Sequence, residues 1–295
     1  MKTTGDIGEL DLIRRITRQL PTRRDVVVGT GDDCAVVRIH GSKDDLVYTT
    51  DAVIEGVHFL PDTDAEQVGH KAVGRVLSDI AAMGASPLHV LINLVAPASC
   101  PVQRIERIYR GAARLARRFG SAIVGGDTAK GRTLELHVFG VGSVPRGRAL
   151  LRSGAKPGDA IFVTGKLGGS LSGRHLSFVP RLKEGTWLRE GRWANAMIDL
   201  SDGLATDLQH VLNASGVGAE LIEAAIPRSR GSTLHEALTD GEDFELLFTV
   251  PARKAQAFER AWKKAFRLPA TRIGHILRDH GLRPLLQQQG FEHFR

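Results

Sequence analysis

The sequence predicts an α+β protein made of two α/β domains, residues 1–146 and 147–295. Its 295 residues are 42% hydrophobic, which is enough material for two cores. Short strand-like runs and amphipathic helical stretches alternate twice along the chain. The pattern breaks between the two sets at Pro145-Arg146-Gly147-Arg148. The strands meander among the helices, which favours the α+β class over a Rossmann sheet.

The first domain is expected to contain three amphipathic helices and several short strands. Apolar residues at helical spacing predict the helices at residues 7–20, 65–83 and 102–119, and Gly84 is the expected cap of the second. Apolar runs predict strands at residues 26–28, 35–39, 46–50, 88–95, 122–124 and 134–144.

The second domain repeats this composition. Strands are expected at residues 160–164, 196–199, 219–222, 244–250 and 271–276, and helices at residues 205–215 and 252–265.

The net charge of +7 is compatible with a nucleic-acid partner or with a phosphorylated substrate. Many of the arginines fall on the helix at 102–119, where we expect a solvated basic face. The chain shows no zinc-finger or RNA-recognition-motif signature, so no nucleic-acid partner is expected. The two cysteines, Cys34 and Cys100, lack metal-type spacing and fit a reducing compartment. Residues 1–4 begin no apolar signal region, and no apolar run suggests a membrane helix. We therefore expect a cytoplasmic protein without a membrane partner.

Acidic residues follow or end several of the apolar runs. The motifs are Gly31-Asp32-Asp33, Thr49-Thr50-Asp51, Ser78-Asp79, Gly125-Gly126-Asp127 and Asp199-Leu200-Ser201-Asp202. Each motif alone reads as a turn or a helix cap. Together they place carboxylates at half-buried positions, where an unpaired charge is costly. Two carboxylates about 5 Å apart repel by roughly 3 kcal/mol at an effective dielectric near 20. A divalent cation would offset this repulsion, and all-oxygen ligands favour magnesium or calcium over zinc.

Hard cations held by carboxylates usually meet phosphates, which makes any phosphate-binding loop in the sequence relevant. The sequence has neither a Walker A motif nor the protein-kinase signatures. The stretch Gly165-Lys166-Leu167-Gly168-Gly169-Ser170 follows a predicted strand. Its amides could hold an anion at the start of a helix, although such turns are also common without a ligand. The residues by themselves therefore indicate metal-dependent phosphate chemistry with a nucleotide.

In this order the motifs resemble those of thiamine-monophosphate kinases along nearly the whole chain. The matching stretches are Gly31–Ala35, Thr50-Asp51, Gly56–Phe59, Leu77–Ala85, Gly125–Thr128, Arg152–Asp159, Ile198–Leu204 and Gly241–Leu246. The wider superfamily includes aminoimidazole ribonucleotide synthetase, selenophosphate synthetase and a hydrogenase maturation protein. The stretches Ser78–Ala85 and Gly241–Leu246 favour the kinase branch.

The resemblance implies a homodimer formed by the N-terminal domain, with ATP bound between the domains near the dimer interface. It implies several magnesium ions held by Asp33, Thr49, Thr50, Asp51, Asp79, Asp127, Asp199 and Asp202. It implies ATP contacts from Tyr109, Gly126, Asp127, Arg152 and Ser201, and substrate contacts from His58, Glu242 and Phe291. Asp51, Asp127, Arg152 and Asp199 are the residues expected to act in catalysis. Outside the family, His58 also reads as a turn histidine, Arg152 as a surface ion pair and Phe291 as a core anchor.

Two departures from the family pattern stand out. Gly168-Gly169-Ser170 is followed almost at once by His175-Leu176 and Pro180-Arg181, where the family usually has a longer helical stretch. The second domain is therefore shortened. Val76 also stands where the family often has a polar Asn.

The activity that the resemblance implies is phosphorylation of thiamine monophosphate by ATP, the last step of thiamine diphosphate biosynthesis. A phosphate monoester is already a competent nucleophile, so direct transfer aligned by magnesium and Arg152 is expected. Two alternatives remain open. One is another ATP-dependent enzyme of the superfamily, and the other is a non-catalytic nucleotide-binding relative.

Overall fold

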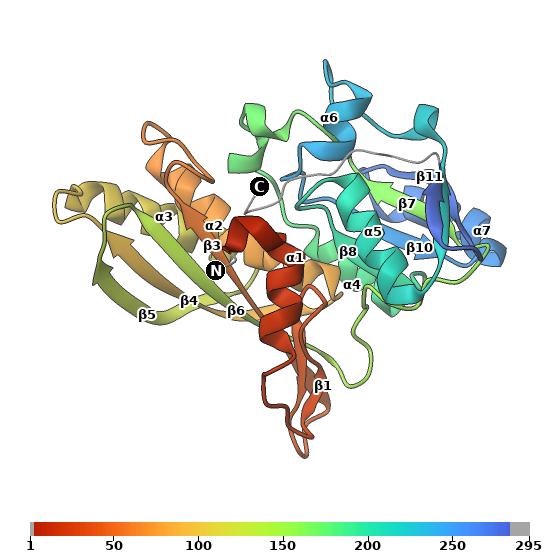
Figure 1. Cartoon of the computed structure of the whole chain (residues 1–295), viewed down its shortest axis with the longest axis horizontal. Helices are drawn as coiled ribbons and strands as arrows, with labels where there is room; N and C mark the ends of the chain where they lie inside the picture. Colours follow the sequence, from red (N-terminus) through yellow and green to blue (C-terminus); the bar gives the residue numbers. More distant parts are fainter. Residues whose placement is uncertain (1–2, 284–295) are drawn as a thin grey trace.

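Two six-stranded sheets, each with its own helices, organise the computed structural model, which describes residues 3–283 (Figure 1). Most neighbouring strands are antiparallel, and the helices pack beside the sheets. The predicted α+β class is confirmed. None of the helices between residues 3 and 283 is both long and apolar enough to span a bilayer.

The N-terminal sheet has the strand order β1-β2-β3-β6-β4-β5. Its strands are β1 (Val26–Val28), β2 (Ala35–Arg38), β3 (Asp44–Ile54), β4 (Ser86–Ala96), β5 (Ala122–Lys130) and β6 (Glu135–Pro145). Its helices are α1 (Thr4–Thr17), α2 (Ala65–Ala82) and α3 (Val102–Arg118). Strands β4 and β5 are parallel, and α3 is the crossover that connects them.

The C-terminal sheet has the strand order β12-β9-β11-β7-β10-β8. Its strands are β7 (Ala160–Thr164), β8 (Ala196–Asp199), β9 (Gly218–Leu221), β10 (Leu246–Val250), β11 (Ala270–Leu277) and β12 (Gly281–Arg283). Its helices are α4 (Leu182–Glu190), α5 (Leu204–Ser215), α6 (Leu234–Thr239) and α7 (Ala252–Ala265). Short 3₁₀ turns occupy Ser170–Ser172, Arg174–Leu176 and Glu223–Ala225.

Helix α2 contacts both halves of the molecule. Asp64 caps its start by accepting the backbone N–H groups of Glu66 and Gln67. Gly84 adopts a left-handed conformation just after its last turn, as the sequence predicted. Between these ends α2 packs on β3 and β6 of the N-terminal sheet and on α4 and β8 of the C-terminal half. Side chains on α2 can therefore contact residues of both sheets.

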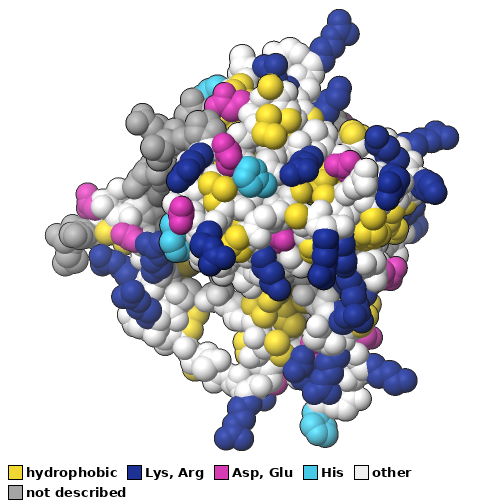
Figure 2. Space-filling model, turned by 90° about the vertical axis from the view of Figure 1, so that its right-hand side faces the viewer, with side chains coloured by type: hydrophobic (Ala, Val, Ile, Leu, Met, Phe, Trp, Pro, Cys, Tyr) yellow, Lys and Arg dark blue, Asp and Glu magenta, His cyan; other side chains and the backbone are white. Residues whose placement is uncertain are grey.

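The basic face of α3 is exposed, as predicted, and three of its arginines also form surface ion pairs. Arg107 pairs with Asp64, and Arg110 and Arg114 pair with Glu66, so these arginines tie α3 to the first turn of α2. Other Lys and Arg side chains are spread over the face of the C-terminal half that Figure 2 shows, among acidic and hydrophobic ones.

Most predicted elements lie within a few residues of their observed bounds, and the differences have local causes. The helix predicted at residues 7–20 begins at Thr4 and ends at Thr17, with Gly8 in a non-helical conformation inside it. Helices α4 and α6 and strand β12 were not predicted. Helix α4 contains Gly185, which weakens a helical pattern. A Cβ there would lie 2.1 Å from the carbonyl oxygen of Ala81, so the glycine allows α4 to approach α2 closely.

The boundary predicted between residues 146 and 147 stays a prediction. It falls in the segment that joins Pro145, the end of β6, to Ala160, the start of β7.

Candidate active site

Four aspartates from both halves of the chain form a carboxylate centre between the two sheets. Asp33 lies in the loop before β2, Asp51 on β3, Asp79 on α2 and Asp199 at the end of β8. Asp33 and Asp199 are buried, and Asp51 is partly exposed. Ser78 on α2 donates its hydroxyl to Asp199 Oδ2 at 2.5 Å, and Thr49 donates to Asp79. The sequence predicted these aspartates and Thr49 as one group, and the fold brings them together.

Arg152 closes one side of the carboxylate centre. Its Nη2 and Nε atoms donate to Asp33 Oδ1 at 2.6 and 3.1 Å, and its backbone N–H donates to Asp32. Arg152 lies in the segment between the two sheets, and its ion-pair partner is the buried Asp33 rather than a surface acid. Asp33 Oδ2 is buried and has no hydrogen-bond donor among the described residues.

The pKa values of three carboxyl groups in the carboxylate centre are raised above the ordinary value for aspartate. Burial, more than the neighbouring aspartates, raises the pKa of Asp33 to about 6 and that of Asp199 to about 7. Burial also raises the pKa of Asp79, and the charges of Asp51, Asp199 and Asp33 add to the effect. These carboxyl groups therefore keep their protons to a higher pH than ordinary aspartates do.

The carboxylate centre fits magnesium by its chemistry. Its polar atoms are carboxylate and hydroxyl oxygens, the ligands that hard cations prefer. Two observations fit the binding of a cation here. Asp33 Oδ2 is buried without a hydrogen-bond donor from the described part of the chain, and neighbouring carboxylates raise the pKa of Asp79.

A stripe of polar side chains on the buried helix α2 connects the carboxylate centre to the C-terminal half. Lys71, Arg75, Ser78 and Asp79 stand at spacings i, i+4, i+7 and i+8, so they share one face. Arg75 Nη2 donates to Asp51 Oδ1 at 2.8 Å, and its Nη1 donates to Glu242 Oε1 at 3.3 Å. We did not predict Lys71, Arg75 or Ser78 as functional residues, although this stripe was a readable signal.

Glu242 is held by three basic or imidazole groups. Lys71 Nζ lies 2.5 Å from Glu242 Oε2, and His175 Nδ1 lies 2.7 Å from the same atom. Lys71 is fully buried and also donates to the carbonyl oxygen of His58 at 2.6 Å. Burial lowers the pKa of Lys71 to about 8, against the attraction of Glu242. Burial opposes ionisation of Glu242 too, yet His175, Lys71 and Arg75 bring its pKa down to about 2. The two groups thus form a buried ion pair near neutral pH.

A cavity of about 550 Å³ adjoins this network. The predicted substrate residues His58 and Glu242 line it, together with Ser201 and Asp202 from the loop after β8. Apolar walls come from Val57, Leu60, Leu171 and Leu176, and polar edges from Arg75, His175 and Asp240. The cavity can therefore hold a partly apolar ligand whose polar end meets charged groups. The predicted substrate residue Phe291 lies outside the described residues.

A second group of predicted residues lies away from the carboxylate centre. Asp51 on β3 pairs with Val138 on β6, Val138 pairs with Ile92 on β4, and Ile92 pairs with Gly126 on β5. Three strand spacings separate Asp51 from Gly126, or about 14 Å. Asp127 on β5 accepts the backbone N–H of Thr128, and Thr50 alternates to the face opposite Thr49 and Asp51. Tyr109 is on α3 and packs against the N-terminal core. The described chain therefore does not bring these residues to the carboxylate centre.

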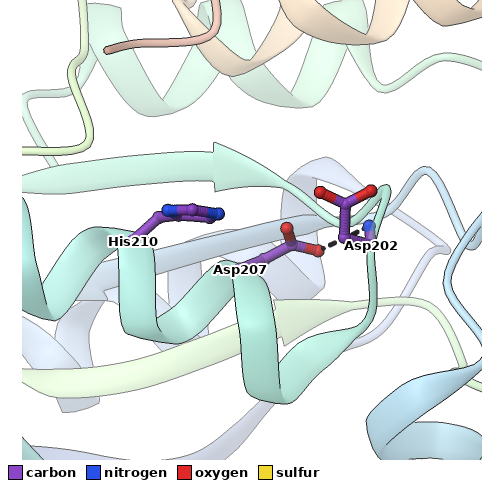
Figure 3. A group of neighbouring side chains, drawn as sticks. All are labelled: Asp202, Asp207 and His210. Atoms are coloured by element: carbon purple, nitrogen blue, oxygen red, sulfur yellow. Dashed lines mark hydrogen bonds between the residues drawn. The ribbon is translucent and has the colours of Figure 1, made fainter. Parts of the chain in front are cut away.

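Asp202 belongs to a small cluster with Asp207 and His210. Figure 3 shows Asp207 and His210 on neighbouring turns of α5, and Asp202 in the loop that precedes the helix. One potential ligand atom from each residue lies within 4.8 Å of those of the other two. Asp207 accepts the backbone N–H groups of Asp202 and Gly203, both at 3.1 Å. The spacing of Asp202 and Asp207 around the helix start was the available signal for Asp207, which we did not predict.

Two amides of the glycine-rich stretch at residues 165–170 are already hydrogen-bonded to carboxylates of the chain. The N–H of Gly168 donates to both oxygens of Asp243 at 3.1 Å, and the N–H of Gly169 donates to Asp240 Oδ2 at 3.0 Å. These two amides are therefore not available to a ligand anion, because carboxylates of the same chain accept their hydrogen bonds. The expected helix is also absent there, and Ser170–Ser172 forms a 3₁₀ turn.

Comparison with known proteins identifies the family to which this architecture belongs. Residues 31–144 match the family described as AIR synthase related protein, N-terminal domain, and residues 179–286 match its C-terminal domain. A thiamine-monophosphate kinase from Salmonella typhimurium is 38% identical over 328 aligned residues, covering 97% of this chain and 98% of the relative.

Solved structures agree with these matches. A chain described as AaThiL complexed with AMPPCP and TMP superimposes with a TM-score of 0.87 at 31% identity, covering 99% of both chains. A thiamine-monophosphate kinase from Stenotrophomonas maltophilia K279a superimposes with a TM-score of 0.76 at 34% identity, covering 92% of this chain and 94% of the other.

The fold and the paired domain matches define a member of the AIR synthase related proteins, which are built from two α/β domains. Within that class the chain belongs to the thiamine-monophosphate kinase family. The alignment of 328 positions is longer than the chain of 295 residues, so the relatives carry positions that this chain lacks.

Proposed function

We propose that this chain transfers the γ-phosphoryl group of ATP directly to the phosphate of thiamine monophosphate, with magnesium, giving ADP and thiamine diphosphate. The carboxylate centre beside a partly apolar cavity is the observation that carries this proposal. The family membership supports the donor and the acceptor, because the AaThiL chain is described as complexed with AMPPCP and TMP.

Asp33, Thr49, Asp51, Asp79 and Asp199 would hold magnesium in the carboxylate centre, and Thr50, Asp127 and Asp202 would contribute further ligands. Bound magnesium supplies charge neutralisation for the phosphates of both substrates. The residues themselves position the reactants. His58 and Glu242 hold the acceptor in the cavity, whereas Gly126, Ser201 and Tyr109 contact ATP. Phe291 is proposed as a further acceptor contact.

Arg152 would neutralise negative charge on the phosphoryl group during its transfer. Its guanidinium lies beside Asp33 at the edge of the carboxylate centre, where a phosphoryl group held by magnesium would be within its reach. No side chain needs to act as a strong base, since the acceptor is a phosphate monoester. Alignment of donor and acceptor between two sheets is then the main contribution of the protein.

A homodimer formed through the open face of the N-terminal sheet is part of the proposal. Val124 and Phe139 are exposed on β5 and β6, and β5 is an edge strand with exposed residues along most of its length. The distance of about 14 Å between Asp51 and Gly126 within one chain also favours a site completed by a second copy. A cytoplasmic location stays a prediction from composition.

A coupled assay of ADP release tests the function. We expect turnover with thiamine monophosphate and none above background with thiamine or with the acceptors of other superfamily members. Turnover with another acceptor alone would assign the chain to a different reaction. Absence of turnover despite ATP binding would indicate a non-catalytic relative.

A further inference from the structure

Arg75 stands between the carboxylate centre and the cavity. Its Nη2 atom lies 2.8 Å from Asp51 Oδ1, its Nη1 atom lies 3.3 Å from Glu242 Oε1, and its side chain lines the cavity. We propose that Arg75 binds the phosphate group of the acceptor and so selects a phosphorylated ligand over the free alcohol. This inference rests on the proposed function, in which the acceptor is a phosphate monoester.

The hydrogen-bonding capacity of Arg75 is not used up in the described structure. A guanidinium has five N–H donors, and the Nε–H of Arg75 is buried without an acceptor among the described residues. Such a buried orphan donor is uncommon and calls for a missing partner. The planar fork of a guanidinium matches two phosphate oxygens, which gives this ligand class both affinity and orientation.

The bond from Arg75 to Glu242 is the one most readily exchanged. Glu242 Oε2 also lies 2.5 Å from Lys71 Nζ and 2.7 Å from His175 Nδ1. Both distances are shorter than the 3.3 Å between Glu242 Oε1 and Arg75 Nη1. Glu242 therefore keeps two partners when Arg75 turns toward a ligand. The guanidinium carbon of Arg75 also lies 5.9 Å from the ring centroid of Phe244, a contact that helps to hold the group at this edge of the cavity.

The charges around the cavity require a cation at this point. Asp202, Asp240 and Glu242 line it, and a phosphate dianion would be repelled by all three. Among the described lining residues, Arg75 carries the only permanent positive charge. The apolar walls suit a ring system, so the phosphate end of the acceptor lies toward Arg75 and the carboxylate centre.

Binding measured without ATP tests this role. Isothermal titration calorimetry with thiamine monophosphate and with thiamine gives the preference of the full chain for the phosphorylated ligand. We expect Arg75→Met, which keeps the stem and removes the charge, to lower this preference by about 10- to 100-fold, the loss typical of a charge-assisted contact. Thiamine affinity should not fall, because thiamine has no phosphate for Arg75 to bind and its thiazolium cation is not attracted by a guanidinium. The KM for thiamine monophosphate should rise by a similar factor, with the KM for ATP nearly unchanged.

Arg110→Met is the matched control, since Arg110 is exposed on α3 and makes a 3.3 Å ion pair with Glu66. It should leave the preference intact. An unchanged preference in Arg75→Met, or a rise in the KM for ATP alone, overturns the proposal. If Arg75→Met does not fold, Arg75→Lys decides: we expect a reduced preference because the fork is lost, and an undiminished one overturns the proposal. Wild-type protein that binds neither ligand and makes no thiamine diphosphate would instead overturn the proposed function.

Discussion

Ser78 and Asp199 join the two halves of the molecule through one hydrogen bond of 2.5 Å. Ser78 is on α2, beside the N-terminal sheet, and Asp199 ends β8 of the C-terminal sheet. Arg152 adds a second connection by donating to Asp33 from the segment between the sheets. The carboxylate centre therefore exists only when the two halves are docked, and its residues can be tested one at a time.

Replacing Asp51 by Asn should abolish phosphoryl transfer while leaving the fold intact. The change keeps the volume of the side chain but removes a charge proposed to hold magnesium. We expect kcat to fall by at least about 10²- to 10³-fold, the scale for losing one electrostatic contact in a catalytic site. Loss of the ion pair with Arg75 and relief of repulsion with Asp79 oppose each other in stability, so the melting temperature should move little. Asp44→Asn, at the exposed start of the same strand, is the control. Near-normal turnover of Asp51→Asn would remove Asp51 from the metal site.

Transfer should proceed without a phosphoenzyme. The acidic side chains of the carboxylate centre are proposed to hold magnesium, and direct attack by the acceptor phosphate needs no protein nucleophile. Incubation with γ-labelled ATP in the absence of thiamine monophosphate should leave no label on the protein. Stoichiometric label that chases into thiamine diphosphate would contradict direct transfer.

Magnesium should be required beyond the amount that complexes ATP. Asp33, Asp51, Asp79 and Asp199 offer more oxygens than one octahedral ion takes when it also keeps waters and phosphate oxygens. The rate should therefore continue to rise with free magnesium once nearly all ATP is complexed, and Asp199→Asn should shift this curve to higher magnesium. Saturation at negligible free magnesium would argue that several of these aspartates are structural.

The stability of the metal-free protein toward unfolding should depend on pH through the ionisation of Asp199. Its pKa is raised to about 7 by burial, so the folded state binds a proton that the unfolded state releases above about pH 4. The contribution of Asp199 to stability is complete below pH 4 and is lost as the pH rises to about 7. Asp199→Asn should thus match the wild type at pH 4 and exceed it at pH 8 by an amount on the order of a few kcal/mol.

Urea unfolding in the presence of EDTA measures this difference at each pH. Excess magnesium should reduce or reverse the advantage of Asp199→Asn at pH 8, since the cation stabilises the wild-type carboxylate. An advantage of the variant that is equal at pH 4 and pH 8 would show that Asp199 ionises normally in the folded protein.

Gly126 should tolerate no side chain, for a reason that is independent of ATP. A Cβ at Gly126 would lie 1.8 Å from the carbonyl oxygen of Ile92, so alanine there must push β5 away from β4. We expect Gly126→Ala to destabilise the fold by about 1–3 kcal/mol. Gly125→Ala is a matched control, because its Cβ would meet Leu91 at an ordinary 3.9 Å. Thermal unfolding compares the two, and equal stability would mean that β5 shifts without cost.

The sequence predicted the elements with strong periodicity and the acidic members of the site. Asp33, Asp51, Asp79 and Asp199 were recognisable because each follows an apolar run, where a charge is conspicuous. The roles of Lys71 and Arg75 were not predicted, because single basic residues on a helix are usually solvated. Only the packing of α2 between two sheets buries these two side chains. The separation of Asp127 from Asp51 could not be predicted, because it depends on a strand order in which β6 and β4 intervene. The amides of Gly168 and Gly169 could not be assigned either, since their partners Asp243 and Asp240 come from a distant segment.

The position of α2 between the sheets also has a kinetic consequence. Widening the gap between the halves to admit a nucleotide or release thiamine diphosphate must break the Ser78–Asp199 and Lys71–Glu242 contacts. Both lie at buried positions, where water cannot immediately replace the lost partner. We predict that breaking and re-forming these two contacts limits turnover, which a fall of kcat in more viscous solvent would show.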